Sequence, residues 1–390
     1  MLFIRRQRDH NPSINILIAV RHPVGGIRTF LRYVYRQFDP LKYKITIVAP
    51  NHPQMKVLMD DLHKHRVIFI PLTEYPSAGE VFKTIFKTIR KNNFDLIHSQ
   101  GLTAGVLTAL PAKIYGIAHM MTAHDVFLEN QFKGSAGFLK KIISMTVLPL
   151  IDRIHCVSKD VLDNYMEFIP RMRFFKHKLC AIPNGIEIGR FLSAKPVDLR
   201  KQFGLTEDTF LIGFLGRFMS QKGFIYLMEA MLKLKDKQDN LPKKPVLLTF
   251  GEGGFIREEK IQAKKMGIAD YICFNPFVPN IASVLKGLDV VVMPSLWEAC
   301  GLIAMETMVA GTPFIGTNCI GLREVLKDTP AIVVPMRSSD AICDAIIKEM
   351  TCPSTEDFYK FIPPAAKRFD VSKSAKEIEN LIQCLSAKSK

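Results

Sequence analysis

The stretch DVVVMPSLWEACGLIAMETMVAGTPFIGTN, residues 289–318, spells a complete strand–helix–strand unit. Its two ends are apolar and rich in β-branched residues, which is typical of parallel strands buried on both faces of a sheet. Between them the run GLIAMETMVA begins at Gly301 and stops at Gly311, shortly before Pro313, which predicts a helix with a glycine at each end. The stretch therefore predicts an α/β fold with a parallel sheet.

The same alternation of strands and helices extends outward in both directions. A polar segment at 191–208, which contains Pro196, divides the predicted strands into two series and reads as a linker. We therefore expect two Rossmann-like domains in tandem, an N-terminal one at 1–190 and a C-terminal one at 191–370, with a last helix at 371–390 that packs back on the first domain. The expected strands are 14–20, 44–50, 66–72, 94–100, 119–125, 153–159 and 178–184 in the first series, and 210–216, 245–253, 271–277, 289–295, 312–318 and 331–335 in the second.

Two strand-to-helix turns carry residues suited to an anionic ligand, because ligands of such sheets bind beyond the carboxyl ends of the strands. Gly25 and Gly26 follow the first strand, where their amides allow a close approach by a phosphate or a sugar. Arg217 and Lys222 follow the first strand of the second series, where two cations can neutralise a diphosphate. Each pair also has a plain structural interpretation, as a turn or as solvated surface charge.

Glu298 and Glu306 are the only charged residues between positions 294 and 313. An unpaired carboxylate is costly in apolar surroundings, so both predict a polar ligand whose groups become their partners. The amides of Cys300, Gly301 and Leu302, at the start of the predicted helix, would face an incoming anion. The plain alternative is that one glutamate stabilises the helix dipole and the other lies on the surface.

His124 follows an N-domain strand and precedes Asp125, a position that favours a site residue over a core histidine. Three further histidines, His98, His119 and His155, show no usable spacing and are interpreted as structural.

These motifs, in this order along the chain, resemble the family 4 glycosyltransferases of the GT-B fold. The family's paired glutamates, with seven residues between them, appear as Glu298-ACGLIAM-Glu306 and are followed by TMVAGTP. Cys300 and Thr307 depart from the family, which often has Phe and Ala at these positions. The other matching motifs are the Gly25-Gly26 loop, His124 in MTAHDVF, VSKDV (157–161) with IPNGIE (182–187), Arg217 and Lys222 in GRFMSQKG, and Gly251-Glu252-Gly253.

The resemblance implies two Rossmann-like domains whose parallel sheets face a central cleft. It implies a retaining transferase that moves a sugar from a nucleoside diphosphate sugar to a glycan or lipid-linked acceptor in cell-envelope or polysaccharide biosynthesis. Glu306 would bind the donor ribose, Glu298 the transferred sugar, and Arg217 with Lys222 the diphosphate. His124 would lie beside the reacting sugar. An idle nucleotide-sugar-binding scaffold, or an epimerase of the same fold, are the alternatives, and the intact motifs disfavour both.

No cofactor is expected. The sequence has no Asp-x-Asp pair to hold a divalent metal ion, and the family uses Arg and Lys in its place.

The net charge of +16 is concentrated in residues 1–190, which hold 27 Lys and Arg against 14 Asp and Glu. Two segments, 80–93 and 131–145, combine basic and apolar residues, so they are either ordinary surface helices or helices that rest on an anionic membrane. A cytoplasmic protein, peripheral to the inner face of a membrane in the second case, fits both interpretations. Nucleic acid is not an expected partner, because no groove-reading helix or aromatic-plus-basic strand motif is evident.

Overall fold

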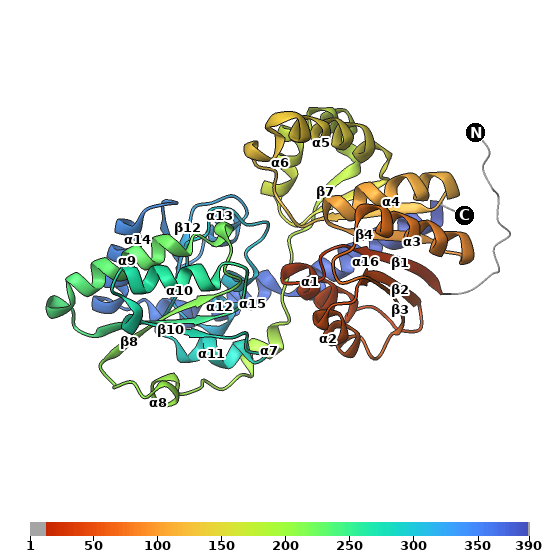
Figure 1. Ribbon diagram of the computed structural model, residues 1–390. Helices are drawn as coiled ribbons and strands as arrows, with labels where there is room; N and C mark the ends of the chain where they lie inside the picture. Colours follow the sequence, from red (N-terminus) through yellow and green to blue (C-terminus); the bar gives the residue numbers. More distant parts are fainter. Residues whose placement is uncertain (1–12, 389–390) are drawn as a thin grey trace. The chain divides into compact units, whose positions relative to one another are not determined.

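The computed structural model describes residues 13–388, which form two units, each built on one parallel sheet (Figure 1). Unit 1 comprises the described residues up to Gly185 together with those from Val371 onward, and unit 2 runs from Ile186 to Asp370. The prediction of two Rossmann-like α/β domains is confirmed. The ends of the domain ranges expected from the sequence, residues 1–12 and 389–390, lie outside the described residues.

The sheet of unit 1 has seven parallel strands in the order β3-β2-β1-β4-β5-β6-β7. Every strand overlaps a range expected from its apolar run, because strands buried on both faces need no polar alternation. The strands are β1 (Ile14–Val20), β2 (Tyr43–Pro50), β3 (Arg66–Leu72), β4 (Leu96–Gln100), β5 (Ala118–Ala123), β6 (Arg153–Cys156) and β7 (Leu179–Ala181).

The helices of unit 1 connect these strands, and one comes from the end of the chain. The last helix, α16, packs on α1, β4 and β5, where Tyr43 donates a hydrogen bond to Glu379 Oε1 at 3.0 Å. The helices are α1 (Gly26–Tyr35), α2 (Pro53–Asp61), α3 (Ala78–Lys91), α4 (Gly101–Tyr115), η1 (Glu129–Phe132), α5 (Gly134–Val147), η2 (Leu148–Leu150), α6 (Lys159–Phe168), η3 (Pro170–Lys178) and α16 (Val371–Lys388), where η marks a 3-10 helix.

The sheet of unit 2 has six parallel strands in the order β10-β9-β8-β11-β12-β13. The strands are β8 (Thr209–Leu215), β9 (Lys244–Phe250), β10 (Ile272–Asn275), β11 (Val290–Met293), β12 (Phe314–Thr317) and β13 (Ile332–Val334). The helices are α7 (Ile188–Leu192), α8 (Leu199–Phe203), η4 (Ser220–Lys222), α9 (Phe224–Asp236), η5 (Gln238–Asn240), α10 (Ile256–Lys265), η6 (Ala269–Tyr271), α11 (Ile281–Gly287), α12 (Leu302–Ala310), α13 (Leu322–Leu326), α14 (Ser339–Thr351) and α15 (Thr355–Phe369).

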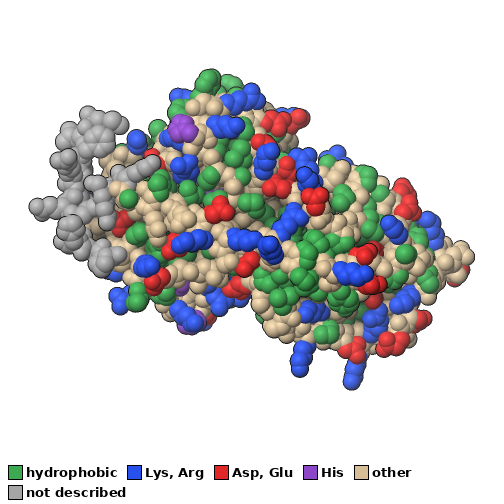
Figure 2. All heavy atoms as spheres, turned by 180° about the vertical axis from the view of Figure 1, so that it is seen from behind, with side chains coloured by type: hydrophobic (Ala, Val, Ile, Leu, Met, Phe, Trp, Pro, Cys, Tyr) green, Lys and Arg blue, Asp and Glu red, His purple; other side chains and the backbone are tan. Residues whose placement is uncertain are grey.

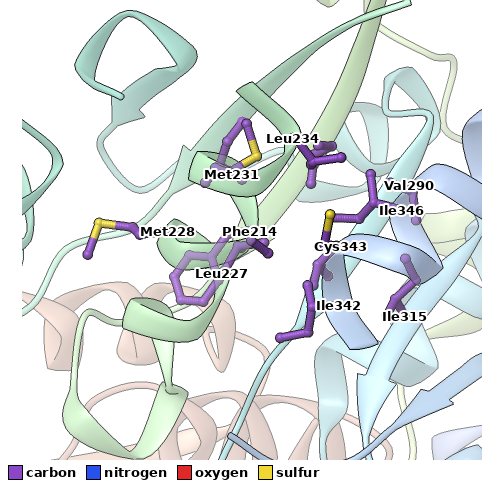
Figure 3. Packing of buried hydrophobic residues seen from close by; sticks show 14 of the residues in the cluster. Phe214, Leu227, Met228, Met231, Leu234, Val290, Ile315, Ile342, Cys343 and Ile346 are labelled. Carbon is purple, nitrogen blue, oxygen red and sulfur yellow. The ribbon is translucent and has the colours of Figure 1, made fainter. Parts of the chain in front are cut away.

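The core of unit 2 shows why α9 and α14 form where they do. Their apolar residues recur at helical spacing, as in Leu227, Met231 and Leu234 of α9, and are fully buried. Figure 3 shows these side chains with those of α14 against Phe214 of β8 and Ile315 of β12. Each such side chain contributes about 1.5–3 kcal/mol by its burial, so the core fixes the strands whose ends carry the site.

The polar segment 191–208 differs from the expected linker. It contains α8, lies within unit 2, and is tied to it by a hydrogen bond from the Val197 amide to the Ser283 carbonyl and by an Arg200–Asp289 ion pair at 2.6 Å. Leu199 is buried there. The segment therefore belongs to unit 2 and does not mark the passage between the units, which falls between Gly185 and Ile186.

Candidate active site

The strand order of unit 2 places its predicted site residues together. The chain passes from β8 outward to β10 and then returns to the other side of β8 with β11, so the connections after β8 and β11 diverge. A switch of this kind opens a crevice at the carboxyl ends of the strands, where ligands bind. Arg217 and Lys222 lie in the connection after β8, and Glu298 lies in the connection after β11.

Hydrogen bonds from the backbone and from one side chain hold these two connections against each other. The Leu296 amide donates to the Gln221 carbonyl at 2.8 Å, and Gln221 Nε2 donates to the Trp297 carbonyl at 2.8 Å. Gly223 adopts a left-handed conformation (φ 61°), and a Cβ at this position would lie 2.2 Å from the Pro294 carbonyl oxygen. Glycine is therefore required for the loop that carries Lys222 to approach the end of β11.

This approach produces an ion pair that the sequence did not predict. Lys222 Nζ lies 2.6 Å from Glu298 Oε1, and the two side chains are only 16% and 9% exposed. The same oxygen accepts a hydrogen bond from Ser295 Oγ at 2.7 Å, and Ser295 is fully buried. The expectation that the partners of Glu298 arrive only with a ligand is wrong, because Lys222 and Ser295 already satisfy Oε1.

The other predicted residues of unit 2 lie on the same two connections and on α12. Arg217 is exposed and, within residues 13–388, makes no hydrogen bond or ion pair, so its guanidinium is available to an anion. Gly301 caps α12 and Leu302 begins it, as the sequence indicated, and Cys300 is buried. Glu306 lies inside α12 and is 5% exposed.

Unit 1 has a corresponding switch point between β1 and β4. Gly25 is the N-cap of α1 with φ 61°, and nothing lies within 4 Å of the point where a Cβ of Gly26 would stand. The turn after β1 therefore leaves open space at the start of a helix, where backbone amides can meet a ligand.

His124 follows β5 and is half-buried. Its Nε2 lies 2.8 Å from the amide oxygen of Gln100, so this nitrogen carries the proton and Nδ1 is an acceptor. Phe30 of α1 packs edge-on against the His124 ring at a centroid distance of 4.9 Å. Burial, with a smaller contribution from His155, lowers the pKa of His124 to about 3, so its ring is neutral at physiological pH.

Gln100 was not among the predicted residues. It ends β4, is 2% exposed, and its amide nitrogen is buried without a hydrogen-bond partner in residues 13–388. Buried donors of this kind are rare in proteins unless a ligand, water or ion satisfies them.

A chain of buried hydrogen bonds crosses the sheet behind His124. His155 Nε2 donates to the Ile182 carbonyl at 2.8 Å, so His155 Nδ1 accepts from Thr122 Oγ1 at 3.1 Å. The Thr122 oxygen then accepts from His98 Nε2 at 2.7 Å, and His98 Nδ1 accepts from the Tyr35 hydroxyl at 2.6 Å. The Ile182 carbonyl at one end of this chain therefore determines which ring nitrogen carries the proton in both His155 and His98. Burial lowers the pKa of His155 to about 4 and that of His98 well below its ordinary value.

The two units therefore offer different chemistry at equivalent places. Unit 2 brings Lys222 and Glu298 into contact and presents Arg217 on the same loop. Unit 1 brings His124 together with Gln100 and Phe30, all uncharged. Within residues 13–388 no cluster of three or more His, Cys, Asp or Glu side chains has the geometry of a metal site.

Two family models match the chain. The model described as Glycosyltransferase Family 4 matches residues 24–190, and that described as Glycosyl transferases group 1 matches residues 197–367. The first match spans the Gly25-Gly26 turn and His124, and the second spans Arg217, Lys222 and both glutamates.

Similar proteins carry related names. An Escherichia coli UDP-Gal:alpha-D-GlcNAc-diphosphoundecaprenol alpha-1,3-galactosyltransferase is 23% identical over 79% of this chain and 80% of its own length. The O-antigen biosynthesis glycosyltransferase WclY of Escherichia coli is 25% identical over 85% of this chain and 94% of its own. The crystal structure of Anabaena HepE in complex with UDP and glucose superposes with a TM-score of 0.80 at 18% identity, over 95% of this chain and all of that one.

Proposed function

Because the chain belongs to the family 4 glycosyltransferases of the GT-B fold, we propose that it transfers a sugar from a nucleoside diphosphate sugar to a glycan or lipid-linked acceptor with retention of configuration. The observation that carries this proposal is the meeting of Lys222 with Glu298 at the switch point of unit 2, beside the exposed Arg217.

Unit 2 would bind the donor. Glycosyl transfer builds positive charge on the sugar ring and negative charge on the departing diphosphate. Arg217 has no competing partner in the described chain and would bind the diphosphate by paired hydrogen bonds. Lys222, held by Glu298 at 2.6 Å, would add a fixed positive charge, which stabilises the leaving group without reorganisation.

The two glutamates would orient the donor. Glu298 Oε1 is occupied by Lys222 and Ser295, which leaves Oε2 to accept a hydrogen bond from a hydroxyl of the transferred sugar. Glu306, inside α12, would accept hydrogen bonds from the ribose hydroxyls, as the family resemblance implies. The amides of Cys300, Gly301 and Leu302 at the start of α12 would face the phosphates.

Unit 1 would bind the acceptor. His124 is neutral and presents Nδ1 as an acceptor, and Gln100 holds a buried amide nitrogen with no partner in the described residues. Hydroxyl groups of a sugar can satisfy both. The Gly25-Gly26 turn supplies open space and backbone amides beside the same sheet edge.

We further propose that no metal ion takes part, with Arg217 and Lys222 neutralising the diphosphate in its place. The acceptor would be an intermediate of cell-envelope or polysaccharide synthesis, as the names of the similar proteins suggest. A lipid-linked acceptor would bring the enzyme to the cytoplasmic face of a membrane. No helix in residues 13–388 is long and apolar enough to cross one.

The decisive experiment is a thermal-shift screen of the purified chain against UDP-, GDP- and ADP-sugars, beginning with UDP-galactose and UDP-glucose. We expect stabilisation by one nucleotide class and loss of that stabilisation in Arg217→Ala. The matched control is Lys237→Ala, an exposed cation at the end of α9. Turnover with a lipid-linked glycan would then be followed by NMR, where retention predicts the same anomeric configuration in donor and product.

Three outcomes would contradict parts of the proposal. A donor that binds without turnover on any acceptor would support the idle scaffold. Inversion of the anomeric centre would refute retention. Loss of activity with a chelator, restored by added divalent metal, would refute the metal-free mechanism.

A further inference from the structure

The sequence did not distinguish the two basic amphipathic segments, which form α3 and α5. In the structure the two helices differ in how far their apolar side chains are buried. α3 buries its apolar residues, with Val81, Ile85 and Ile89 at 1% exposure or less, so it is an ordinary surface helix. α5 buries only Gly137 and Ser144. Its large apolar side chains point outward instead, and they are Phe138 (64% exposed), Leu139 (56%), Ile142 (44%) and Ile143 (39%).

The 3-10 helix η3, which contacts α5, continues this surface. Phe174 of η3 is 84% exposed. Segments 130–151 and 168–178 contain no aspartate or glutamate, and their cations are Lys133, Lys140, Lys141, Arg171, Arg173, Lys176 and Lys178. In the view from behind, hydrophobic and Lys or Arg side chains lie side by side at the top of the picture, at the level of α5 in Figure 1 (Figure 2). We call α5 and η3 together the docking surface.

The cations of the docking surface divide into two groups. Lys140 stabilises the local structure of unit 1, because its Nζ donates to Gln131 Oε1 at 2.8 Å and lies over the Phe127 and Phe132 rings. Arg171 and Lys176 are exposed, and their side chains make no hydrogen bond or ion pair with the described residues. These free cations flank apolar side chains, as in proteins that rest on anionic lipid.

We propose that the docking surface binds the surface of an anionic lipid bilayer. The exposed apolar side chains of α5 and Phe174 would enter the boundary between headgroups and acyl chains, and Arg171, Lys176 and Lys133 would meet the lipid phosphates. A second copy of the chain is a poorer occupant. A twofold interface would set this surface against itself, and its cations would have no opposite charges to meet.

The test is co-sedimentation of the full-length chain with vesicles, measured without donor or acceptor. One set of vesicles is pure phosphatidylcholine and the other is an equimolar mixture with phosphatidylglycerol. We expect binding to the anionic vesicles that weakens with added salt. Arg171→Gln/Lys176→Gln should weaken it by about 25-fold, since each cation near an anionic surface contributes about fivefold. Phe138→Ser/Ile142→Ser should weaken it at least about tenfold.

The matched control is Lys83→Gln/Lys87→Gln on α3, which removes the same charge from exposed positions of the same unit. Its vesicle affinity should stay within about twofold of the parent, because it lies outside the surface. Equal losses in the control and in Arg171→Gln/Lys176→Gln would reduce the effect to net charge and overturn the proposal. So would equal binding to both vesicle types, or no binding at all.

Sedimentation velocity provides a second check. A dimer that Phe138→Ser/Ile142→Ser dissociates would make the surface an interface between copies, against the proposal. All substituted residues are exposed, and circular dichroism should show unchanged folding.

This inference adds a partner to the proposed function and does not depend on it. Donor binding without vesicle binding would refute only the docking surface, and vesicle binding without donor binding would refute only the transferase mechanism.

Discussion

The carboxyl edges of the two sheets have the same topology and opposite chemistry. All ten histidines of the chain precede Gly185, and unit 2 contains none. At the carboxyl edge of unit 1 the neutral side chains of His124 and Gln100 are paired, whereas unit 2 has the Lys222–Glu298 ion pair and Arg217 at its own edge. The ion pair lies where the proposed ligand is charged, and the neutral His124–Gln100 pair lies where the proposed ligand carries hydroxyl groups.

The histidines make the largest predicted difference between the units. Burial lowers the pKa of His119 and His124 to about 3 and that of His155 to about 4. The unfolded chain takes up these protons near pH 6.5 while the folded chain does not, so the stability of unit 1 is lost as the pH falls below about 6.5. The loss is about 1.4 kcal/mol for each buried histidine and each pH unit. Unit 2 lacks this contribution.

Hydrogen–deuterium exchange, corrected for intrinsic rates, measures the two units separately. Between neutral pH and about pH 5.5, peptides from β4 to β6 should lose protection while those from β8 to β12 keep it. His177→Gln, which changes an exposed histidine, serves as the control and should leave the difference intact. Equal loss of protection in both units would show that the buried histidines do not set the response to acid.

Removing a cation from unit 2 should have the next largest effect. Lys222→Ala should lower kcat by at least about 100-fold, the order lost with a charge-stabilising donor. The variant also leaves Glu298 buried without its partner, which destabilises the fold by itself.

The double variant Lys222→Met/Glu298→Gln separates the two effects when its turnover is compared with that of Glu298→Gln, which removes the proposed contact of Glu298 with the sugar but keeps Lys222. The double variant removes both buried charges, so thermal stability should recover while turnover stays low. Turnover that recovers together with stability would mean that Lys222 serves the fold and not the leaving group.

The fold was predictable because its signals are local. Each strand overlaps an apolar run, and α12 begins and ends at the glycines that the sequence marked, Gly301 and Gly311. The Lys222–Glu298 pair was not predictable, because 76 residues separate its members and only the adjacency of β8 and β11 unites them. Ser295 was missed although it lies only three residues from Glu298, because the contact between the two side chains depends on the conformation of the loop.

The chain of buried hydrogen bonds in unit 1 was missed for the same kind of reason as the Lys222–Glu298 pair. His98, Thr122 and His155 lie on three neighbouring strands, and their contact depends on strand order and register, which one sequence does not display. The different burial of the two basic helices was also not predictable from one sequence. Both α3 and α5 combine lysines with apolar residues, but whether an apolar face is covered depends on the neighbours that the tertiary fold supplies.

Within unit 2, Glu306 should affect the nucleotide and not the sugar. Glu306→Ala should weaken binding of the free nucleoside diphosphate by about tenfold, as expected for the loss of one charged hydrogen-bond acceptor. Isothermal calorimetry on the free nucleotide measures this directly. Glu207→Ala, which changes an exposed glutamate in the turn before β8, is the matched control and should leave that affinity unchanged. Unchanged affinity in Glu306→Ala would refute the ribose assignment.

Ser295 should have the smallest effect, and it tests whether the orientation of Glu298 matters. Ser295→Ala removes one of the two donors to Glu298 Oε1 and leaves the Lys222 ion pair in place. The loss of a hydrogen bond to a carboxylate costs about 1.5 kcal/mol at the lower end of the range. Only part of this free energy should be lost from the binding of the sugar, because Lys222 still orients Glu298. We therefore expect KM for the nucleotide sugar to rise by about threefold to tenfold, with the affinity for the free nucleoside diphosphate unchanged. Equal losses for the sugar donor and the free nucleotide would show that Ser295 supports the loop as a whole. The contrast between the units would then rest on Lys222 and Arg217 alone.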